Sequence, residues 1–152
     1  MEPGKRCWSD DLGKLILRLS IGGLLLFHGV AKIMHGIDPI VAAVKGNNTP
    51  DFVAYGVYLG EVLGPILVIV GLWTRLGALM IAVNMIVAVA LAHRGDLGSL
   101  TPMSGGWALE LEGLYFLGAL AILFMGAGRI SIYGARKCAP GNVPPANETK
   151  RM

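Results

Sequence analysis

Four apolar stretches of membrane length occupy most of this 152-residue chain. They cover residues 12–33, 52–73, 76–92 and 106–125. A helix needs about 20 apolar residues to cross a bilayer core of about 30 Å. The 54% of apolar residues, 15% of charged residues and 22 glycines favour closely packed transmembrane helices and exclude a disordered chain or a disulfide scaffold. The sequence therefore predicts an all-α integral membrane four-helix bundle.

The segments outside the four spans are short. Residues 1–11 form an N-terminal lead, residues 12–133 the four-helix domain, and residues 134–152 a Pro-containing tail that is expected to be disordered. Lys and Arg are more frequent beside the termini and the turn between the second and third spans than beside the two outer loops. This bias predicts that both termini are cytoplasmic. We expect a multi-pass protein of a bacterial or archaeal cytoplasmic (inner) membrane. The net charge of +3 reflects this flank bias, and no motif for nucleic-acid binding is present.

The first outer loop contains the pattern of a short helix. Asp38 and Pro39 precede the apolar residues 40–44, and Gly46 follows them. An Asp, then a Pro at the first helical position, and a closing Gly are typical helix start and stop signals. We expect one or two helical turns that lie on the membrane surface as a lid.

The first span carries a stripe of ionisable side chains. Lys14, Arg18, His28 and Lys32 fall within an arc of about 80° when the segment is wound at 3.6 residues per turn. Ionisable residues inside a span usually face the bundle interior and mark functional sites. The alternative for Lys14 and Lys32 is that their long side chains reach the two membrane surfaces.

Glu61 lies near the bilayer midplane, because it is nine residues, or about 14 Å, from the outer end of the second span. Pro65 cannot donate a hydrogen bond to the carbonyl of Glu61, so a backbone acceptor is left at the same depth. Gly56, Gly60 and Gly64 form a ridge of small residues that allows a neighbouring helix to approach closely.

The third and fourth spans add further polar residues. Asn84 lies near the middle of the third span and His93 at its outer end, on opposite faces of a straight helix. Glu110 and Glu112 point about 200° apart, so at most one faces the bundle axis. The sequence does not decide between them, and Glu110 is the one that we include in the site.

These residues predict a mixed-charge pocket that opens outward, with two readings. In the structural reading, Glu61 pairs with His28, Lys32 or Arg18 and fixes the register of the helices. In the chemical reading, Glu61 and His28 are catalytic groups that move protons to or from a quinone head group, or Lys and His side chains hold a small anion. Lys32, Arg18, Asn84, His93 and Glu110 would then bind the ligand. No metal is expected, because no E-x-x-H or H-x-x-x-H spacing is present.

Three blocks of the chain carry a family pattern. The first is an Arg in an apolar run, at Leu17-Arg18-Leu19, followed by H-G-x-x-K at residues 28–32. The second comprises E-V-L-G at residues 61–64, G-L-W-T-R at residues 71–75 and Asn84-Met85, and the third comprises Glu110, Leu114-Tyr115 and G-A-G-R-I-S at residues 126–131. With these blocks in order over residues 12–133, the sequence resembles the DoxX family of small four-helix membrane proteins. Tyr133 departs from the pattern, since Asp is more usual there.

The resemblance implies a connection with membrane redox systems. The family is named after a subunit of archaeal terminal oxidase and thiosulfate:quinone oxidoreductase systems, and some relatives belong to redox complexes that handle oxidative stress. We therefore expect a redox-associated subunit whose outward-opening pocket takes a quinone head group or a small sulfur anion. If the chain is enzymatic, it is a quinone-linked oxidoreductase subunit with quinone as its cofactor.

Other members of the wider group are similar to cargo receptors or assembly helpers of membrane proteins, so the resemblance alone does not select a mechanism. The alternative is a non-catalytic membrane partner or assembly subunit. A small-solute transporter is a third reading. Four helices without an inverted repeat could form a transporter only as an oligomer. The expected partners are the lipid bilayer, a membrane or periplasmic protein, and a second copy of the chain.

Overall fold

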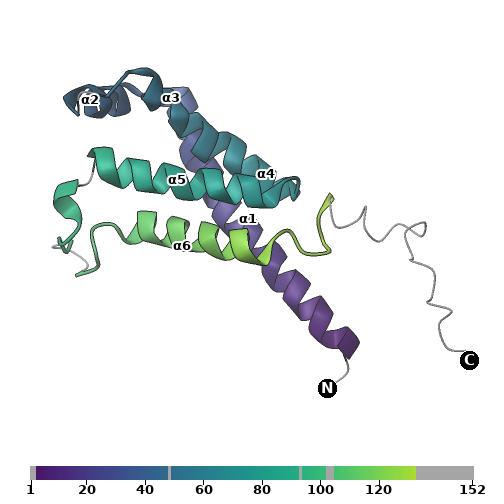
Figure 1. Ribbon diagram of the computed structural model, residues 1–152. Coiled ribbons are helices and arrows are strands. Elements are labelled where there is room, and N and C mark those ends of the chain that lie inside the picture. The colour runs from purple at the N-terminus through teal and green to yellow at the C-terminus, as the bar shows by residue number, and fades with distance from the viewer. Residues whose placement is uncertain (1–2, 48, 93, 102–104, 133–152) are drawn as a thin grey trace, which may run out of the picture.

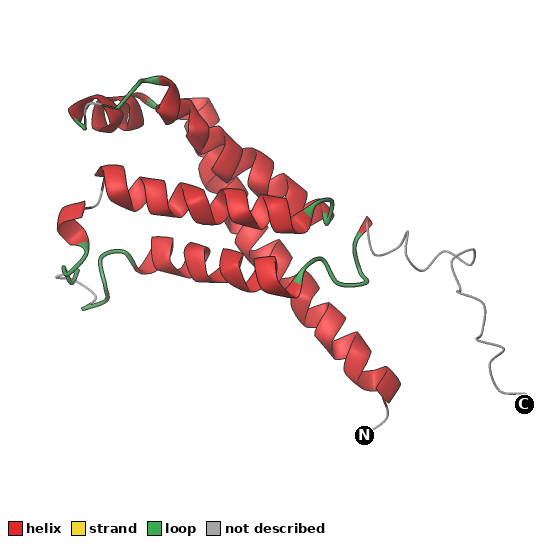
Figure 2. Ribbon diagram, in the orientation of Figure 1, coloured by secondary structure: helices red, strands yellow, loops and turns green. Residues whose placement is uncertain are grey.

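The computed structural model describes residues 3–47, 49–92, 94–101 and 105–132, and this part of the chain is made of helices joined by short loops (Figure 2). In chain order the elements are α1 (Pro3–His35), α2 (Asp38–Gly46), α3 (Phe52–Tyr58), the π-helix η1 (Leu59–Leu63), α4 (Gly64–Val70), α5 (Thr74–Ala92), the 3₁₀-helix η2 (Arg94–Asp96) and α6 (Glu110–Met125). The segments α3, η1 and α4 follow one another without a break and form one rod.

The long helices pack as two antiparallel pairs (Figure 1). One pair consists of α1 and the α3–η1–α4 rod, and the other consists of α5 and α6. The elements α2 and η2 lie at one end of the bundle, which we call the α2 end. The turn between α4 and α5 and the last residues of α6 lie at the opposite end, which we call the Arg18 end.

Three helical segments are long and apolar enough to cross a membrane: Trp8–His35, Phe52–Val70 and Thr74–Leu91. Large apolar side chains on the outside of the bundle, such as Phe27 and Phe124, are exposed, as expected for lipid-facing positions. The all-helical, multi-pass character predicted from the sequence is therefore confirmed. With 16 residues, α6 measures about 24 Å, and its role as a fourth span stays a prediction, as does the cytoplasmic position of the termini.

Helix α6 begins at Glu110 and not at residue 106 as the sequence predicted, because the preceding residues are held in a turn. The Thr101 amide donates to the Gly106 carbonyl at 2.9 Å, and the Trp107 indole donates to the Leu97 carbonyl at 2.9 Å. The second predicted span likewise ends at Val70, since Gly71 adopts a left-handed conformation with φ 77°.

Glycine contacts show that the two helix pairs are close at the Arg18 end and separate toward the α2 end. A Cβ on Gly77 of α5 would lie 2.7 Å from the carbonyl oxygen of Gly64, which real side chains do not tolerate. One turn further along the rod, a Cβ on Gly60 would collide with the side chain of Asn84. After another turn, a Cβ on Gly56 would meet nothing within 4 Å. The predicted glycine ridge is therefore a close contact at two of its three positions and faces open space at the third.

The short helix predicted in the first loop is present as α2. Ile37 occupies the N-cap position and Asp38 is the first helical residue, so the helix begins one residue earlier than the sequence pattern suggests. Val44 of α2 is fully buried against Ala54 and Val57 of α3. The Asn47 amide also donates to the Leu91 carbonyl of α5 at 3.1 Å, so α2 bridges the ends of both helix pairs.

Candidate functional site

A cavity of about 890 Å³ fills the space where the two helix pairs separate. Its walls come from α1, α2, α3, η1, α5 and α6, and most of the lining is apolar. This volume lies within the range of about 300–1,000 Å³ that is usual for small-molecule sites. The polar and titratable residues of the lining are His28, Lys32, Tyr55, Glu61, Asn84, Glu112 and Tyr115.

Glu61 is the centre of the polar part of the cavity. The residue is 4% exposed, and one carboxylate oxygen, Oε1, accepts hydrogen bonds from Lys32 Nζ at 2.5 Å and from Asn84 Nδ2 at 3.3 Å. The other oxygen, Oε2, is buried and has no hydrogen-bond partner among the described residues. A buried carboxylate oxygen without a donor is costly, so this atom is prepared to accept a hydrogen bond from a ligand.

The backbone around Glu61 departs from a regular helix. The segment Leu59–Leu63 is a π-helix, in which the Gly64 amide donates to the Leu59 carbonyl. Pro65 lacks the amide that would donate to the Glu61 carbonyl in a regular helix. That carbonyl faces α1 at Gly29, where a Cβ would collide with it. Single π-helical turns are frequent at functional sites, and this one carries Glu61 into the lining of the cavity.

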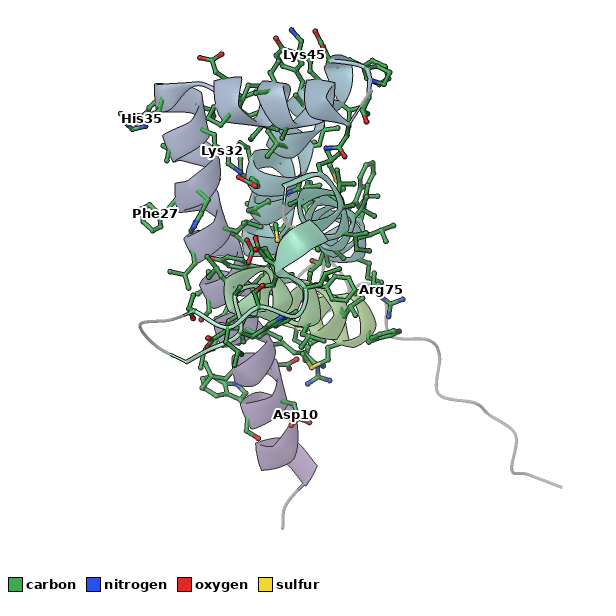
Figure 3. The ribbon with its side chains drawn as sticks, turned by 90° about the vertical axis from the view of Figure 1, so that its left-hand side faces the viewer. Asp10, Phe27, Lys32, His35, Lys45 and Arg75 are labelled. Atoms are coloured by element: carbon green, nitrogen blue, oxygen red, sulfur yellow. The ribbon has the colours of Figure 1, made fainter. Side chains whose placement is uncertain are left out.

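Helix α1 contributes Lys32 and His28 from adjacent turns of one face. Figure 3 shows Lys32 pointing from α1 toward the neighbouring helices, whereas Phe27 and His35 point away from the bundle. His28 Nδ1 lies 3.1 Å from the Leu24 carbonyl oxygen, which can only accept a hydrogen bond, so Nδ1 is the donor and Nε2 is the ring nitrogen left for a ligand.

Helix α6 contributes Glu112 and Tyr115 instead of the predicted Glu110. Glu112 is half-buried and lines the cavity, while Glu110 is exposed and lies outside the lining. Tyr115 is buried, and its ring packs edge-to-face against His28 with the centroids 5.9 Å apart. Sequence reasoning did not place Tyr115 in the site, although its spacing of three residues from Glu112 puts the two side chains on one helix face.

Arg18 lies in a different place from the other predicted site residues. Fourteen residues separate it from Lys32, which is about 21 Å along α1. Arg18 is 1% exposed, and its guanidinium donates four hydrogen bonds to backbone carbonyls. The acceptors are Val68 at 2.8 Å, Ile69 at 2.8 Å, Ala127 at 2.6 Å and Ile130 at 2.8 Å.

This arrangement joins three parts of the chain at the Arg18 end. Val68 and Ile69 belong to the last turn of α4, whose carbonyls have no partners within the helix and carry partial negative charge. The segment after α6 is held as well, since the Arg129 amide donates to Asp11 Oδ1 at 3.0 Å. We call Arg18 with its four carbonyl acceptors the Arg18 clasp.

The structure therefore brings together four of the seven residues predicted for the site: His28, Lys32, Glu61 and Asn84. It places Arg18 in the clasp and Glu110 on the surface. His93, the predicted tail of residues 134–152 and Tyr133 lie outside the described residues. The roles predicted for these side chains stay predictions.

Comparisons with known proteins give a family and two relatives. The family model described as DoxX matches residues 13–94. An uncharacterized protein of Haemophilus influenzae is 32% identical over 117 residues, which cover 76% of this chain and 84% of that protein. A Bacillus subtilis protein named "Putative oxidoreductase CatD" is 31% identical over 81 residues, 53% of this chain and 60% of that protein. No solved structure matches the chain.

Proposed function

Since this chain belongs to the DoxX family, we propose that it is a redox-associated membrane protein that binds the ring of a quinone or quinol in the cavity beside Glu61. The observation that carries the proposal is that Glu61 lines a large apolar cavity while its buried Oε2 lacks a hydrogen-bond donor among the described residues. A quinol hydroxyl supplies such a donor. The apolar walls suit the ring and exclude water from it.

The charge balance of the lining favours a neutral ring over a small sulfur anion. The positive charge of Lys32 is already matched by Glu61, with Nζ and Oε1 2.5 Å apart. Glu112 adds a second carboxyl group to the same cavity. An anion would have to displace Glu61 from Lys32 and would still lie near both carboxylates, which makes its burial unfavourable.

The arrangement supports proton exchange with the bound ring. Lys32 and Asn84 hold Oε1, so the carboxylate is fixed and Oε2 is left as the acceptor for a ligand. When a quinol gives up two electrons, it also releases two protons. Glu61 accepts one of them at Oε2, and His28 accepts the other at Nε2. The electrons pass to a partner redox protein, and a redox role agrees with the word "oxidoreductase" in the name of the Bacillus subtilis relative. Quinone reduction runs through the same groups in reverse.

We place the protein in a bacterial or archaeal cytoplasmic membrane, with α6 as the fourth span and both termini in the cytoplasm. The α2 end, with the cavity, then faces the outer side. Lys14, Arg75 and Arg129 lie toward the Arg18 end, and the positive-inside rule assigns such a cluster to the cytoplasmic surface.

The test is native mass spectrometry of the full-length protein released from its own membrane, with Glu61→Gln as the variant. We expect the wild-type protein to retain a quinone and Glu61→Gln to retain about tenfold less, because an amide replaces the charged acceptor. Glu110→Gln is the matched control, since it makes the same change outside the cavity. Equal retention by Glu61→Gln and the wild type would overturn the proposal.

The second candidate is a non-catalytic partner or assembly subunit. Its supporting observation is that the Lys32–Glu61 pair joins α1 to η1, as a purely structural cross-link would. In that case Glu61→Gln lowers the unfolding midpoint, no quinone is retained by any variant, and the native mass spectrum shows a co-purified polypeptide.

A further inference from the structure

The cavity has two flanks of different chemistry. The flank between α1 and α6 carries His28, Lys32, Glu112 and Tyr115. Apart from Glu61, Asn84 and the Tyr55 hydroxyl, the opposite flank, between the α3–η1 segment and α5, is apolar, and its residues include Tyr55, Leu59, Leu79, Val83 and Val87. On the rod and on α5 these residues recur every four positions, so each set forms one helical face. A quinone ring would meet the polar groups of α1 and α6 together with Glu61 and Asn84, and the rest of the α3–η1 and α5 lining offers it apolar contacts.

The apolar flank is open toward the outside of the bundle. Tyr55 is 60% exposed, Leu59 54% and Val83 50%, although all three line the cavity. The helices separate here because the close contact of Gly60 with Asn84 ends one turn before Gly56, which faces open space and also lines the cavity. The interior therefore continues sideways between the rod and α5.

The α2 end of the cavity is covered. Pro39, Ile40 and Ala43 of α2 contribute to the lining, and α2 is fixed by the burial of Val44 and by the hydrogen bond from Asn47 to Leu91. This cover lies across the end of the bundle and leaves the sides uncovered. In a membrane, the sides of a bundle face lipid.

From these three features, and on the basis of the proposed function, we propose that the opening between the α3–η1 segment and α5 holds the isoprenoid chain of a lipid-soluble quinone. The ligand enters from the bilayer through this opening, with its ring directed to Glu61 and its chain lying along Gly56 and Leu59. The apolar opening and Glu61 line one continuous cavity, so a ligand whose ring lies beside Glu61 can extend its chain into the opening. Within one cavity, the head group thus meets the polar side chains and the chain meets apolar ones.

The experiment compares two benzoquinones with the same substituted ring, one without a chain and one with a decyl chain, binding to the full-length protein in detergent. Gly56→Leu fills the opening, and the open space at Gly56 allows the side chain to enter without displacing a neighbour. We expect this variant to bind the decyl quinone about tenfold more weakly, since buried methylene groups contribute most of the chain's affinity. The ring without a chain should bind as it does to the wild type.

Gly23→Leu is the matched control. A Cβ on Gly23 would also meet nothing within 4 Å, but this residue lies on α1 outside the lining, so both quinones should bind the variant as they bind the wild type. Val83→Trp is a second variant that fills the same opening from α5, and thermal unfolding checks that each variant is folded. Unchanged decyl-quinone binding in folded Gly56→Leu and Val83→Trp would overturn the proposal. Equal weakening of both quinones would also overturn it, since the opening would then hold the ring.

Failure of this proposal is distinguishable from failure of the proposed function. If the ring without a chain binds in a Glu61-dependent way and the decyl chain adds no affinity, the chain site is wrong and the ring site stands. If decyl-quinone binding depends on Gly56 but not on Glu61, the opening accepts apolar chains in general, such as phospholipid acyl chains, and both proposals are overturned.

Discussion

Two cationic residues on one face of α1 meet opposite surroundings. The Arg18 guanidinium donates four hydrogen bonds to backbone carbonyls, and a Cβ on the adjacent Gly71 would collide with it. Lys32 meets a single carboxylate oxygen of Glu61, whose second oxygen has no donor in the described structure, beside a cavity of about 890 Å³. In the first site the chain itself accepts from four of the five N–H groups of the guanidinium, whereas the second site leaves an acceptor for another molecule. Burial of charge alone therefore does not identify a ligand site, and an incomplete set of partners is the better sign.

The largest effect is expected from removal of the Arg18 clasp. Arg18→Met leaves four carbonyls without donors and should lower the free energy of unfolding by about 3–5 kcal/mol, as for a broken buried charge interaction. The measurement is unfolding of the full-length protein in mixed micelles with increasing denaturing detergent. Lys45→Met is the control, because its ion pair with Asp51 is exposed on both sides and should contribute at most about 1 kcal/mol. Equal stability of the two variants would mean that the clasp is not structural.

The Lys32–Glu61 pair should behave differently when its charges are removed together. Lys32→Met alone leaves a buried carboxylate unpaired and should cost about 3 kcal/mol. The double variant Lys32→Met with Glu61→Gln should unfold within about 1 kcal/mol of the wild type, since replacement of a whole buried pair is often neutral. The same double variant should lose quinone binding. If it is as unstable as the single variant, the pair is a structural element like the clasp.

The helices could be predicted from the sequence because long apolar runs, Gly and Pro act locally. The cluster of Lys32, Glu61 and Asn84 was also accessible, since depth along each span follows from residue number and helical rise. The place of Arg18 could not be predicted from the sequence. A helical wheel places Arg18 and Lys32 on one face, but the acceptors of Arg18 are backbone carbonyls at residues 68, 69, 127 and 130, which no side-chain pattern marks.

The face that α6 turns toward the cavity could not be predicted from the sequence either. This helix is apolar all round, so its sequence does not indicate which face is turned inward. The choice between Glu110 and Glu112 depends on where the helix begins, and that is fixed by the turn that pairs Leu100 with Trp107. Tyr115 then follows Glu112 into the cavity at a spacing of three residues.

Two glycines provide a smaller contrast between the ends of the bundle. Gly71 has φ 77°, and a Cβ there would collide with Arg18 and lie 2.5 Å from the Cβ of Ser131, so Gly71→Ala should destabilise the protein by about 2 kcal/mol. Gly56→Ala should stabilise it by about 0.5–1 kcal/mol, because the helix gains an alanine where space is open. The measurement is the same unfolding titration. Similar changes in both variants would contradict the difference in packing between the two ends.

The smallest effect on quinone affinity is expected from substitution of the carboxyl groups of α6. Glu112 lines the cavity beside the ring site, whereas Glu110 is exposed and lies outside the lining, although the two residues are only two positions apart. Glu112→Gln should change quinone affinity by about threefold to fivefold, the size of one weakened polar contact, and Glu110→Gln should leave it unchanged. Competitive displacement of the benzoquinone without a chain measures both variants under the same conditions. A larger effect of Glu110→Gln would require α6 to be rotated by about 200° in the membrane, and it would replace the polar flank described above with another set of residues.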